Sequence, residues 1–225
     1  GSAPLLTETH EKFIRRTGHH ILERYGMTET NMVTSNPYNG ERRPGTVGKP
    51  LPDVEIKIND PQTGRENAND EIGMIEVRGP NVFKGYWNMP DKTSLELREN
   101  GYFITGDLGK LSSDGYLSIV GREKDLIISG GYNVYPKEIE DVLNELDKID
   151  ETAVFGILDN DFGERVVAAI VMLENESFDK SKTEIFVNDK LARYKQPKEY
   201  FVLQSLPRNS MGKVQKNLLR KQFSN

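Results

Sequence analysis

Apolar and polar positions follow two different patterns along this chain, and the pattern changes near residue 121. Two stretches alternate residue by residue, VEIKI at 54–58 and MIEVR at 74–78, as strands with one buried face do. Further short strands are predicted at 21–25, 102–104 and 116–120, with turns at 61–64 and 113–115. Many short strands separated by Gly- and Pro-containing turns indicate a small, distorted β-barrel or sandwich-like unit.

After residue 121, helical periodicity joins the strands. Residues 136–146 begin with proline and place Ile139, Val142 and Leu143 on one face, which predicts a helix. Strands are expected at 153–158, 166–173 and 200–203, and helices at 183–191 and, before the barrel-like part, 6–17. We therefore expect an α+β protein in two parts, 1–121 and 122–225, the second built on a small central sheet.

The amino-acid composition excludes or disfavours several classes of function. The net charge of −5 argues against general binding to nucleic acid or to an anionic membrane. The absence of cysteine excludes disulfides, thiolate zinc sites and cysteine nucleophiles. No apolar run approaches the roughly 20 residues that cross a bilayer, and the first residues do not resemble a signal peptide. A soluble, cytoplasmic protein is expected.

The segment ERYGMTET at 23–30 carries the clearest candidate chemistry. A strand leading into a tight turn can direct the Thr28 hydroxyl to a phosphate and the Glu29 carboxylate to Mg²⁺. By itself the segment is equally an ordinary turn facing water. The glycine-rich segment RPGTVGKP at 43–50 permits close approach to a ligand, but a plain turn explains it as well.

Three further charged residues are candidates for holding a nucleotide. Asp107, at the predicted end of a strand, can accept hydrogen bonds from both ribose hydroxyls, and Arg122 can reach the same sugar. Lys213, on a glycine-containing loop, suits carboxylate and phosphate oxygens, although the sequence around it is not the usual phosphate-binding loop. The plain alternatives are a turn-capping aspartate, a solvated arginine and a basic, solvated C-terminal tail.

The order and spacing of these segments are more specific than any one of them. The series GSAPL, ERYGMTE, RPGTVGKPLP, YFITGDLG, YLSIVGREKDLI, SGGYNVYPKEIE and LPRNSMGKVQK resembles the adenylate-forming family over essentially the whole chain. That family includes acyl-CoA synthetases, firefly luciferase and the adenylation domains of peptide synthetases. The resemblance implies two half-reactions. A carboxylate attacks the α-phosphate of ATP to give an acyl-adenylate and pyrophosphate, and the thiol of CoA then displaces AMP.

The resemblance also implies roles for individual residues. Thr28 would hold the α-phosphate beside Gly26, Glu29 would hold Mg²⁺, and Tyr25 would stack on adenine. The ribose would be held by Asp107 and Arg122. In the mobile C-terminal domain, Lys213 would bridge the acyl carboxylate and phosphate in the first step, Gly130 and Gly131 would approach the pantetheine arm of CoA in the second, and Lys124 would be the hinge.

The segments RYGMTETNM, TSNPY and GGYNVYPK resemble the malonyl-CoA synthetase branch, which implies malonate or methylmalonate as the acid. Arg42 matches the arginine that would grip the second carboxylate with two parallel hydrogen bonds. The alternative is a surface arginine beside Glu41. Ser2 and Ala3 would line the acyl pocket. A medium- or long-chain fatty acyl-CoA synthetase and a non-catalytic adenylate-binding module are the rival functions.

Family members are about twice as long as this chain or longer. The Ser/Thr/Gly-rich loop that binds the β- and γ-phosphates in the family is not found in this sequence. We therefore expect the chain to be a fragment that does not turn over alone.

Overall fold

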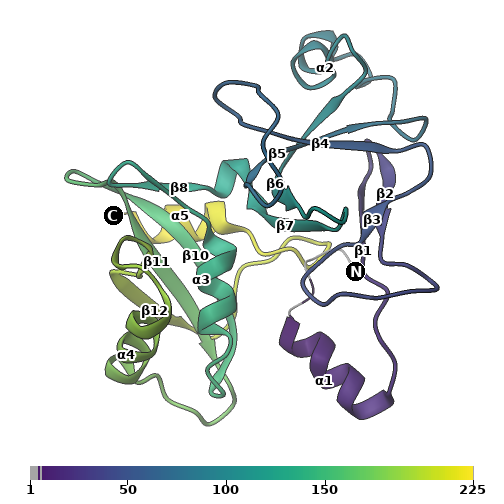
Figure 1. Cartoon of the computed structure of the whole chain (residues 1–225). Helices are drawn as coiled ribbons and strands as arrows, with labels where there is room; N and C mark the ends of the chain where they lie inside the picture. The colour runs from purple at the N-terminus through teal and green to yellow at the C-terminus, as the bar shows by residue number, and fades with distance from the viewer. Residues whose placement is uncertain (1–4, 6, 225) are drawn as a thin grey trace. The chain divides into compact units, whose positions relative to one another are not determined.

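The computed structural model describes residue 5 and residues 7–224, apart from the side chain of Glu8 (Figure 1). It divides the chain into two compact units, residues 5–123 and the residues from 124 onward. The boundary predicted after Gly121 lies close to this division. That the units are the end of a large domain and a mobile small domain stays a prediction.

The N-terminal unit combines helices with two open antiparallel sheets. Its elements are α1 (Thr7–Thr17), β1 (Arg24–Met27), β2 (Asn31–Ser35), β3 (Lys49–Pro50), β4 (Glu55–Asn59), β5 (Gly73–Arg78), α2 (Pro90–Glu96), β6 (Phe103–Leu111) and β7 (Leu117–Arg122). Strands β1, β2 and β3 form one sheet and β4 to β7 the other. The α+β class is confirmed, and within the described residues the barrel-like part consists of these two sheets without closing into a barrel.

One hydrophobic core joins the two sheets. Val33 of β2 packs in the same cluster as Ile75 of β5 and Leu117 of β7, and all three are fully buried. The backbone also connects them, because the Val47 N–H donates to the Leu117 carbonyl oxygen at 2.8 Å. Burial of these branched and aliphatic side chains stabilises the unit by about 1.5–3 kcal/mol each.

Strand β6 is much longer than the predicted strand at 102–104. Gly106 and Gly109 interrupt the alternation that identifies a strand in sequence, yet the ladder with β5 and β7 continues past them. A Cβ at Gly109 would come within 2.7 Å of the Ser118 carbonyl oxygen, so close strand packing requires glycine there. Asp107 therefore lies inside a strand, and its prediction as a strand-end residue is wrong.

The C-terminal unit is built on one central sheet. Its elements are β8 (Ile127–Ser129), β9 (Tyr132–Val134), α3 (Pro136–Leu143), β10 (Ile149–Asp159), β11 (Gly163–Met172), α4 (Lys180–Lys190), β12 (Glu199–Leu203) and α5 (Lys216–Phe223), with short 3₁₀ turns at Glu123–Asp125 and Arg193–Lys195. Strand β11 pairs antiparallel with β10 and parallel with β12 (Figure 1). The predicted small central sheet is confirmed.

Both faces of this sheet are buried, so its strands carry two hydrophobic cores. Val154 and Val166 face one core with Ile139 of α3, whereas Phe155 faces the other core with Leu219 of α5. Adjacent residues of one strand point to opposite faces, which is why Val154 and Phe155 belong to different cores.

The C-terminal segment is a helix rather than the basic, solvated tail that the sequence left open. Leu219 of α5 is fully buried, and the ring of Phe223 stacks on Phe201 with 4.0 Å between ring centroids. Leu219 and Phe223 are four residues apart and so share one helix face, while Lys221, two residues after Leu219, is exposed.

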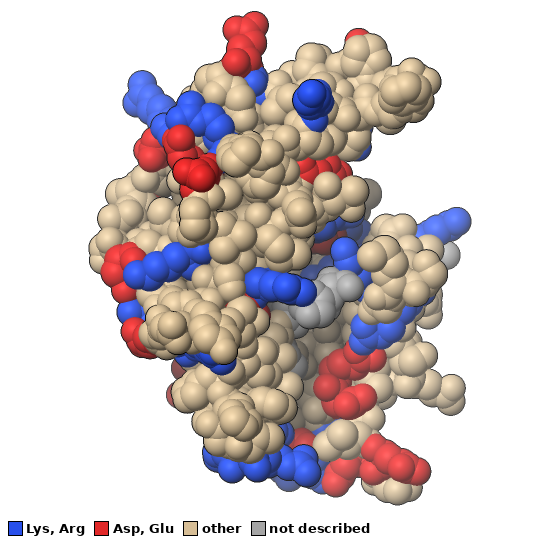
Figure 2. Space-filling view, turned by 90° about the vertical axis from the view of Figure 1, so that its right-hand side faces the viewer, with Lys and Arg blue, Asp and Glu red and all other residues tan. Residues whose placement is uncertain are grey.

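Charge is mixed on the face that Figure 2 displays, where Lys and Arg side chains are interspersed with Asp and Glu. No uniformly basic surface of the kind that binds nucleic acid is seen on that face. Among the described residues, none of the helices is both long enough and apolar enough to span a bilayer.

Candidate functional site

Asp107 is the centre of a buried polar cluster in the N-terminal unit. The Tyr25 hydroxyl donates to Asp107 Oδ2 at 2.6 Å, and Arg122 Nε lies 3.1 Å from Oδ1. The fold explains the pairing, because Asp107 and Arg122 are cross-strand partners in the β6–β7 ladder. The structure thus brings together three residues that the sequence assigned to one nucleotide.

Tyr25 is 8% exposed and contributes to the hydrophobic core of its unit. Burial, followed by the nearby Asp107 carboxylate, raises the pKa of the Tyr25 hydroxyl well above its usual value. The hydroxyl therefore keeps its proton and acts as a fixed donor to Asp107. Little of the ring is exposed for stacking on adenine in this structure, and that predicted role remains a prediction.

The hairpin turn between β1 and β2 presents Thr28 to solvent. The Thr30 N–H donates to the Met27 carbonyl oxygen at 3.2 Å, which closes the turn. Gly26 is required by packing, because a Cβ there would come within 2.0 Å of the Asn31 carbonyl oxygen. Thr28 follows Tyr25 by three residues, so its Cα lies within about 10 Å of the Tyr25 Cα and close to the Asp107 cluster.

Glu29 is half-buried in the same turn and has one defined partner. The Tyr86 hydroxyl lies 3.2 Å from Glu29 Oε1 and 2.6 Å from Glu96 Oε2, so the two carboxylates share one tyrosine. Burial, reinforced by these two carboxylates, raises the pKa of Tyr86, which keeps the hydroxyl protonated. Within the described part of the chain, no group of three or more metal-ligating side chains is found.

Arg42 is anchored entirely by backbone carbonyls. Its Nε donates to Pro37 O at 3.2 Å, Nη1 to His20 O at 2.7 Å and Nη2 to Tyr38 O at 3.0 Å. A guanidinium has five N–H groups, so one remains on each terminal nitrogen. Among the described residues no carboxylate pairs with Arg42, and its charge is left to interact with a ligand.

The neighbouring Arg43 differs from Arg42 because its charge is paired with carboxylates. Arg43 pairs with Asp114 at 2.6 Å and with Glu41 at 3.0 Å, and its guanidinium lies 4.0 Å from the centroid of the Tyr116 ring. The positive charge of Arg43 is thus neutralised by these two carboxylates within the chain. Glu41, which the sequence offered as a surface partner for Arg42, is engaged by Arg43 instead.

The RPGTVGKP segment is a structural loop in its second half. A Cβ at Gly48 would come within 2.0 Å of the Ser35 backbone, and Gly48 has a φ of +84°. The glycine is therefore needed so that the loop can lie against β2, and no ligand is required to explain it.

The Lys213 loop of the C-terminal unit has a fixed backbone and a free ammonium group. The Lys213 N–H donates to Asn209 Oδ1 at 2.9 Å, and the Asn209 N–H donates to the Lys213 carbonyl oxygen at 3.0 Å. Arg208 donates to the Gly212 carbonyl oxygen at 2.6 Å and pairs with Glu151 of β10. Among the described residues the Lys213 ammonium makes no hydrogen bond or ion pair, which leaves it available to an anionic ligand.

Gly130 and Gly131 form the two-residue turn of the β8–β9 hairpin. Their φ angles are +58° and +80°, the backbone geometry that favours glycine at both positions of such a turn. Two aromatic residues lie beside the turn, and one of them, Tyr194, was not singled out from the sequence. Tyr132 follows it directly and stacks on Tyr194, with ring centroids 4.6 Å apart. The pair is distant in sequence, so no periodicity reveals it, and the only signal is an aromatic residue between two basic ones in Arg193–Lys195.

The remaining predicted residues are placed as follows. Lys124 is exposed in the short turn at Glu123–Asp125, where the two units divide. Ser2 and Ala3 lie outside the residues that the structure describes.

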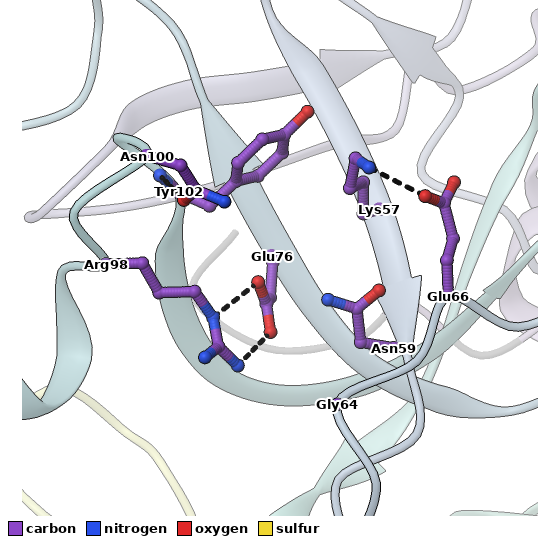
Figure 3. A pocket seen from close by; sticks show the side chains of 8 residues that line it. All are labelled: Lys57, Asn59, Gly64, Glu66, Glu76, Arg98, Asn100 and Tyr102. Atoms are coloured by element: carbon purple, nitrogen blue, oxygen red, sulfur yellow. Dashed lines mark hydrogen bonds and ion pairs between the residues drawn. The ribbon is translucent and has the colours of Figure 1, made fainter.

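A separate polar pocket of about 240 Å³ lies beside β4 and β5 in the N-terminal unit (Figure 3). Glu76 accepts two hydrogen bonds from Arg98, at 2.8 and 2.6 Å, and Lys57 pairs with Glu66 at 2.7 Å. The charged groups of this pocket thus neutralise one another. None of the predicted site residues lines it, and we assign it a structural role.

Comparison with known proteins identifies the family of the chain. The family model described as AMP-binding enzyme matches residues 1–87, and that described as AMP-binding enzyme C-terminal domain matches residues 138–213. The chain belongs to this adenylate-forming family of AMP-binding enzymes.

Within the family, the chain is 44% identical along its whole length to a malonate–CoA ligase from Arabidopsis thaliana, of which it covers 38%. The ATP-bound crystal structure of MatB from Rhodopseudomonas palustris is 53% identical, with a TM-score of 0.97, and the chain covers 45% of it. A long-chain fatty acid–CoA ligase from Bacillus subtilis is 40% identical, and the chain covers 40% of it. The chain thus spans about two fifths of the length of these proteins.

Proposed function

We propose that this chain supplies the C-terminal part of an ATP-dependent, AMP-forming ligase that joins malonate or methylmalonate to CoA. The observation that carries the proposal is the Asp107 cluster, in which a buried carboxylate is held by Tyr25 and Arg122 close to the Thr28 turn. A carboxylate held in this way can accept the two hydroxyls of a ribose without first having to be ordered.

In the first half-reaction, a carboxylate oxygen of the acid attacks the α-phosphorus of ATP and pyrophosphate leaves. The exposed Thr28 hydroxyl is suited to donate to an α-phosphate oxygen. Mg²⁺, held by Glu29 together with the phosphates, would neutralise charge on the departing pyrophosphate, and one carboxylate suffices because Mg²⁺ commonly binds through few protein ligands. The free Lys213 ammonium would stabilise the charge that develops between the acid and the phosphate.

In the second half-reaction, the sulfur of CoA attacks the acyl carbon, AMP leaves and the thiol proton is released. The Gly130–Gly131 turn has no side chains to obstruct a narrow ligand such as a pantetheine arm. The Tyr132–Tyr194 stack gives the side of this turn a fixed aromatic wall.

The preference for a dicarboxylic acid is supported by Arg42. Its two remaining N–H groups lie on separate terminal nitrogens, and a carboxylate can accept one from each with its two oxygens. A fatty acid has no second carboxylate and would leave this charge unpaired, which disfavours the long-chain alternative.

The test compares malonate with octanoate in a full-length ligase that carries this chain, before and after Arg42→Ala. Hydrogen bonds to charged groups contribute about 1.5–3 kcal/mol, so kcat/KM for malonate should fall at least about tenfold in the variant. Arg43→Ala is the matched control and should leave malonate kcat/KM nearly unchanged. Preference for octanoate, or an unchanged malonate kcat/KM in Arg42→Ala, would contradict the proposal.

A second test addresses catalysis itself. We expect the 225-residue chain alone to show no ATP–pyrophosphate exchange, because no loop for the β- and γ-phosphates is found in its sequence. Exchange by the purified chain would refute that expectation. AMP binding without CoA-dependent chemistry in the full-length protein would instead favour a non-catalytic module.

A further inference from the structure

We propose that Tyr86 is a positioning residue for Glu29, and that Glu96 of α2 fixes the Tyr86 hydroxyl for this task. Tyr86 thereby sets the affinity of the ligase for Mg²⁺ in its nucleotide complex. The inference rests on the proposed function, in which Glu29 holds Mg²⁺, and it names two residues that the sequence did not single out.

The Glu29 carboxylate is anchored through one oxygen and leaves the other open. The Tyr86 hydroxyl lies 3.2 Å from Glu29 Oε1, and among the described residues this is the only hydrogen bond of the Glu29 side chain. A metal-binding carboxylate is commonly hydrogen-bonded by a neighbouring group, which orients the ligand and strengthens metal binding. The Tyr86 hydroxyl occupies the position of such a partner.

The backbone of Glu29 is held independently of the Tyr86 hydroxyl. The Phe83 N–H donates to the Glu29 carbonyl oxygen at 2.8 Å. The Asn81 side chain donates to the Thr30 carbonyl oxygen at 2.7 Å. These contacts fix the turn between β1 and β2, so the Tyr86 hydroxyl is not needed to hold that turn. What the hydroxyl adds is the direction of the Glu29 side chain.

Tyr86 is held in turn by three residues of α2. Its hydroxyl lies 2.6 Å from Glu96 Oε2, and its backbone N–H donates to Thr93 Oγ1 at 2.9 Å. The Lys92 ammonium lies over the Tyr86 ring, 3.9 Å from the centroid, and 3.9 Å from Glu96 Oε1. A hydroxyl held in this way is pre-organised, so it does not have to be ordered when a cation binds.

Hydrophobic packing does not account for α2. None of its side chains is buried, and Leu95 is 75% exposed. A helix of seven residues also gains little stability from its own hydrogen bonds. Three of its side chains contact Tyr86, which lies beside the candidate metal ligand. The helix is therefore explained as the support of this tyrosine.

The shared hydroxyl also keeps two negative charges close together. The Tyr86 hydroxyl has one proton for two carboxylates, so neither hydrogen bond has its full strength. The Glu29 and Glu96 oxygens lie within about 6 Å of each other, where like charges repel. A divalent cation at Glu29 relieves this repulsion, so the arrangement favours the occupied metal site.

The experiment measures nucleotide binding without turnover. A full-length ligase that carries this chain is titrated by calorimetry with the ATP analogue whose α,β-bridging oxygen is replaced by methylene, once with Mg²⁺ and once with EDTA. Tyr86→Phe keeps the ring and removes the hydroxyl. It should weaken binding of the Mg²⁺ complex about tenfold and leave binding in EDTA within about twofold, because only the support of the metal ligand is lost.

Tyr102→Phe is the matched control. The Tyr102 hydroxyl also donates to a glutamate, Glu55 Oε2 at 2.8 Å, but that carboxylate pairs with Arg78. Its removal should change binding of the Mg²⁺ complex by less than about twofold, because the two sites are independent. Glu96→Gln keeps an oxygen acceptor for Tyr86 and should bind the Mg²⁺ complex within about threefold of the native affinity, whereas Glu96→Leu should approach the Tyr86→Phe value.

The Glu29→Gln background decides the mechanism. If Tyr86 acts through Glu29, Tyr86→Phe should cause no further loss there, because the group that it positions no longer holds the metal. Equal losses in both backgrounds, or a parallel loss in EDTA, would show a general structural effect and overturn the proposal. If Glu29→Gln weakens the Mg²⁺ complex and Tyr86→Phe does not, the Tyr86 role alone fails. If Glu29→Gln itself has no effect, the Mg²⁺ role in the proposed function fails as well.

Discussion

Replacing Asp107 with asparagine tests whether the buried cluster is as rigid as its contacts indicate. Asparagine keeps the size of the side chain but removes its negative charge. The Tyr25 hydroxyl then donates to a neutral oxygen, and the Arg122 guanidinium loses its ion pair. Because Asp107 is only 6% exposed, water cannot readily replace either interaction at the carboxylate.

The size of the effect follows from the exposure of each partner. The side chain of Arg122 is 46% exposed, so its ion pair is screened and contributes about 1 kcal/mol. The Tyr25 hydrogen bond is buried, and weakening it from a charged to a neutral acceptor costs about 1 kcal/mol. The expected loss is about 2 kcal/mol, or roughly 8 °C in the melting temperature of a unit of this size.

Differential scanning calorimetry of the 225-residue chain measures this loss, and isothermal titration with AMP measures the ligand contact. Tyr25→Phe is the matched control, because it removes one hydrogen bond and leaves the Arg122 pair intact. It should cost about half as much. An Asp107→Asn chain that melts within about 2 °C of the native chain would refute the reasoning, since the cluster would then contribute no appreciable stability.

Three further outcomes are expected. Lys213→Ala in the full-length ligase should abolish acyl-adenylate formation yet spare thioester formation from supplied acyl-adenylate, and equal loss in both half-reactions would show that its assigned role is wrong. Gly131→Leu should spare acyl-adenylate formation and block transfer of the acyl group to CoA. Gly131→Asn, which tolerates positive φ, should retain the hairpin turn and a larger share of the CoA transfer rate. Normal CoA transfer by the leucine variant would show that Gly131 does not line the path of the thiol. Burial raises the pKa of Tyr200 to about 12, above the value of about 10 in the unfolded chain. The stability that the protonated hydroxyl contributes is therefore complete below about pH 10 and is lost as the pH rises through about 12. Alkaline melting curves of Tyr200→Phe should show a smaller loss over that range, and an unchanged slope would count against this assignment.

Sequence patterns predicted the parts of the fold in which one face of an element is buried. The alternation at 74–78 corresponds to β5, and the apolar face of 136–146 corresponds to α3. The patterns did not reveal α2, which buries none of its side chains and therefore has no apolar face to detect. They also underestimated β6, where close strand packing demands glycine and hides the alternation.

In the candidate site, too, some contacts were predicted from the sequence and others were not. Asp107 and Arg122 were assigned together from sequence, and the ladder between β6 and β7 places them opposite each other. The anchoring of Arg42 by three backbone carbonyl oxygens was not foreseen, because any residue type can supply a carbonyl oxygen. Such contacts depend on the path of the chain and leave no signature in residue identity.

Among the residues that the structure describes, the two cores that enclose the central sheet of the C-terminal unit consist of residues between Ile127 and Phe223. A segment that begins near Lys124 buries its own hydrophobic side chains, and it should therefore fold when expressed by itself. At that size it is well suited to solution NMR, and ligation to an unlabelled N-terminal partner would allow segmental isotope labelling. The resonances of the Lys213 loop could then be followed during each half-reaction without signals from the rest of the protein.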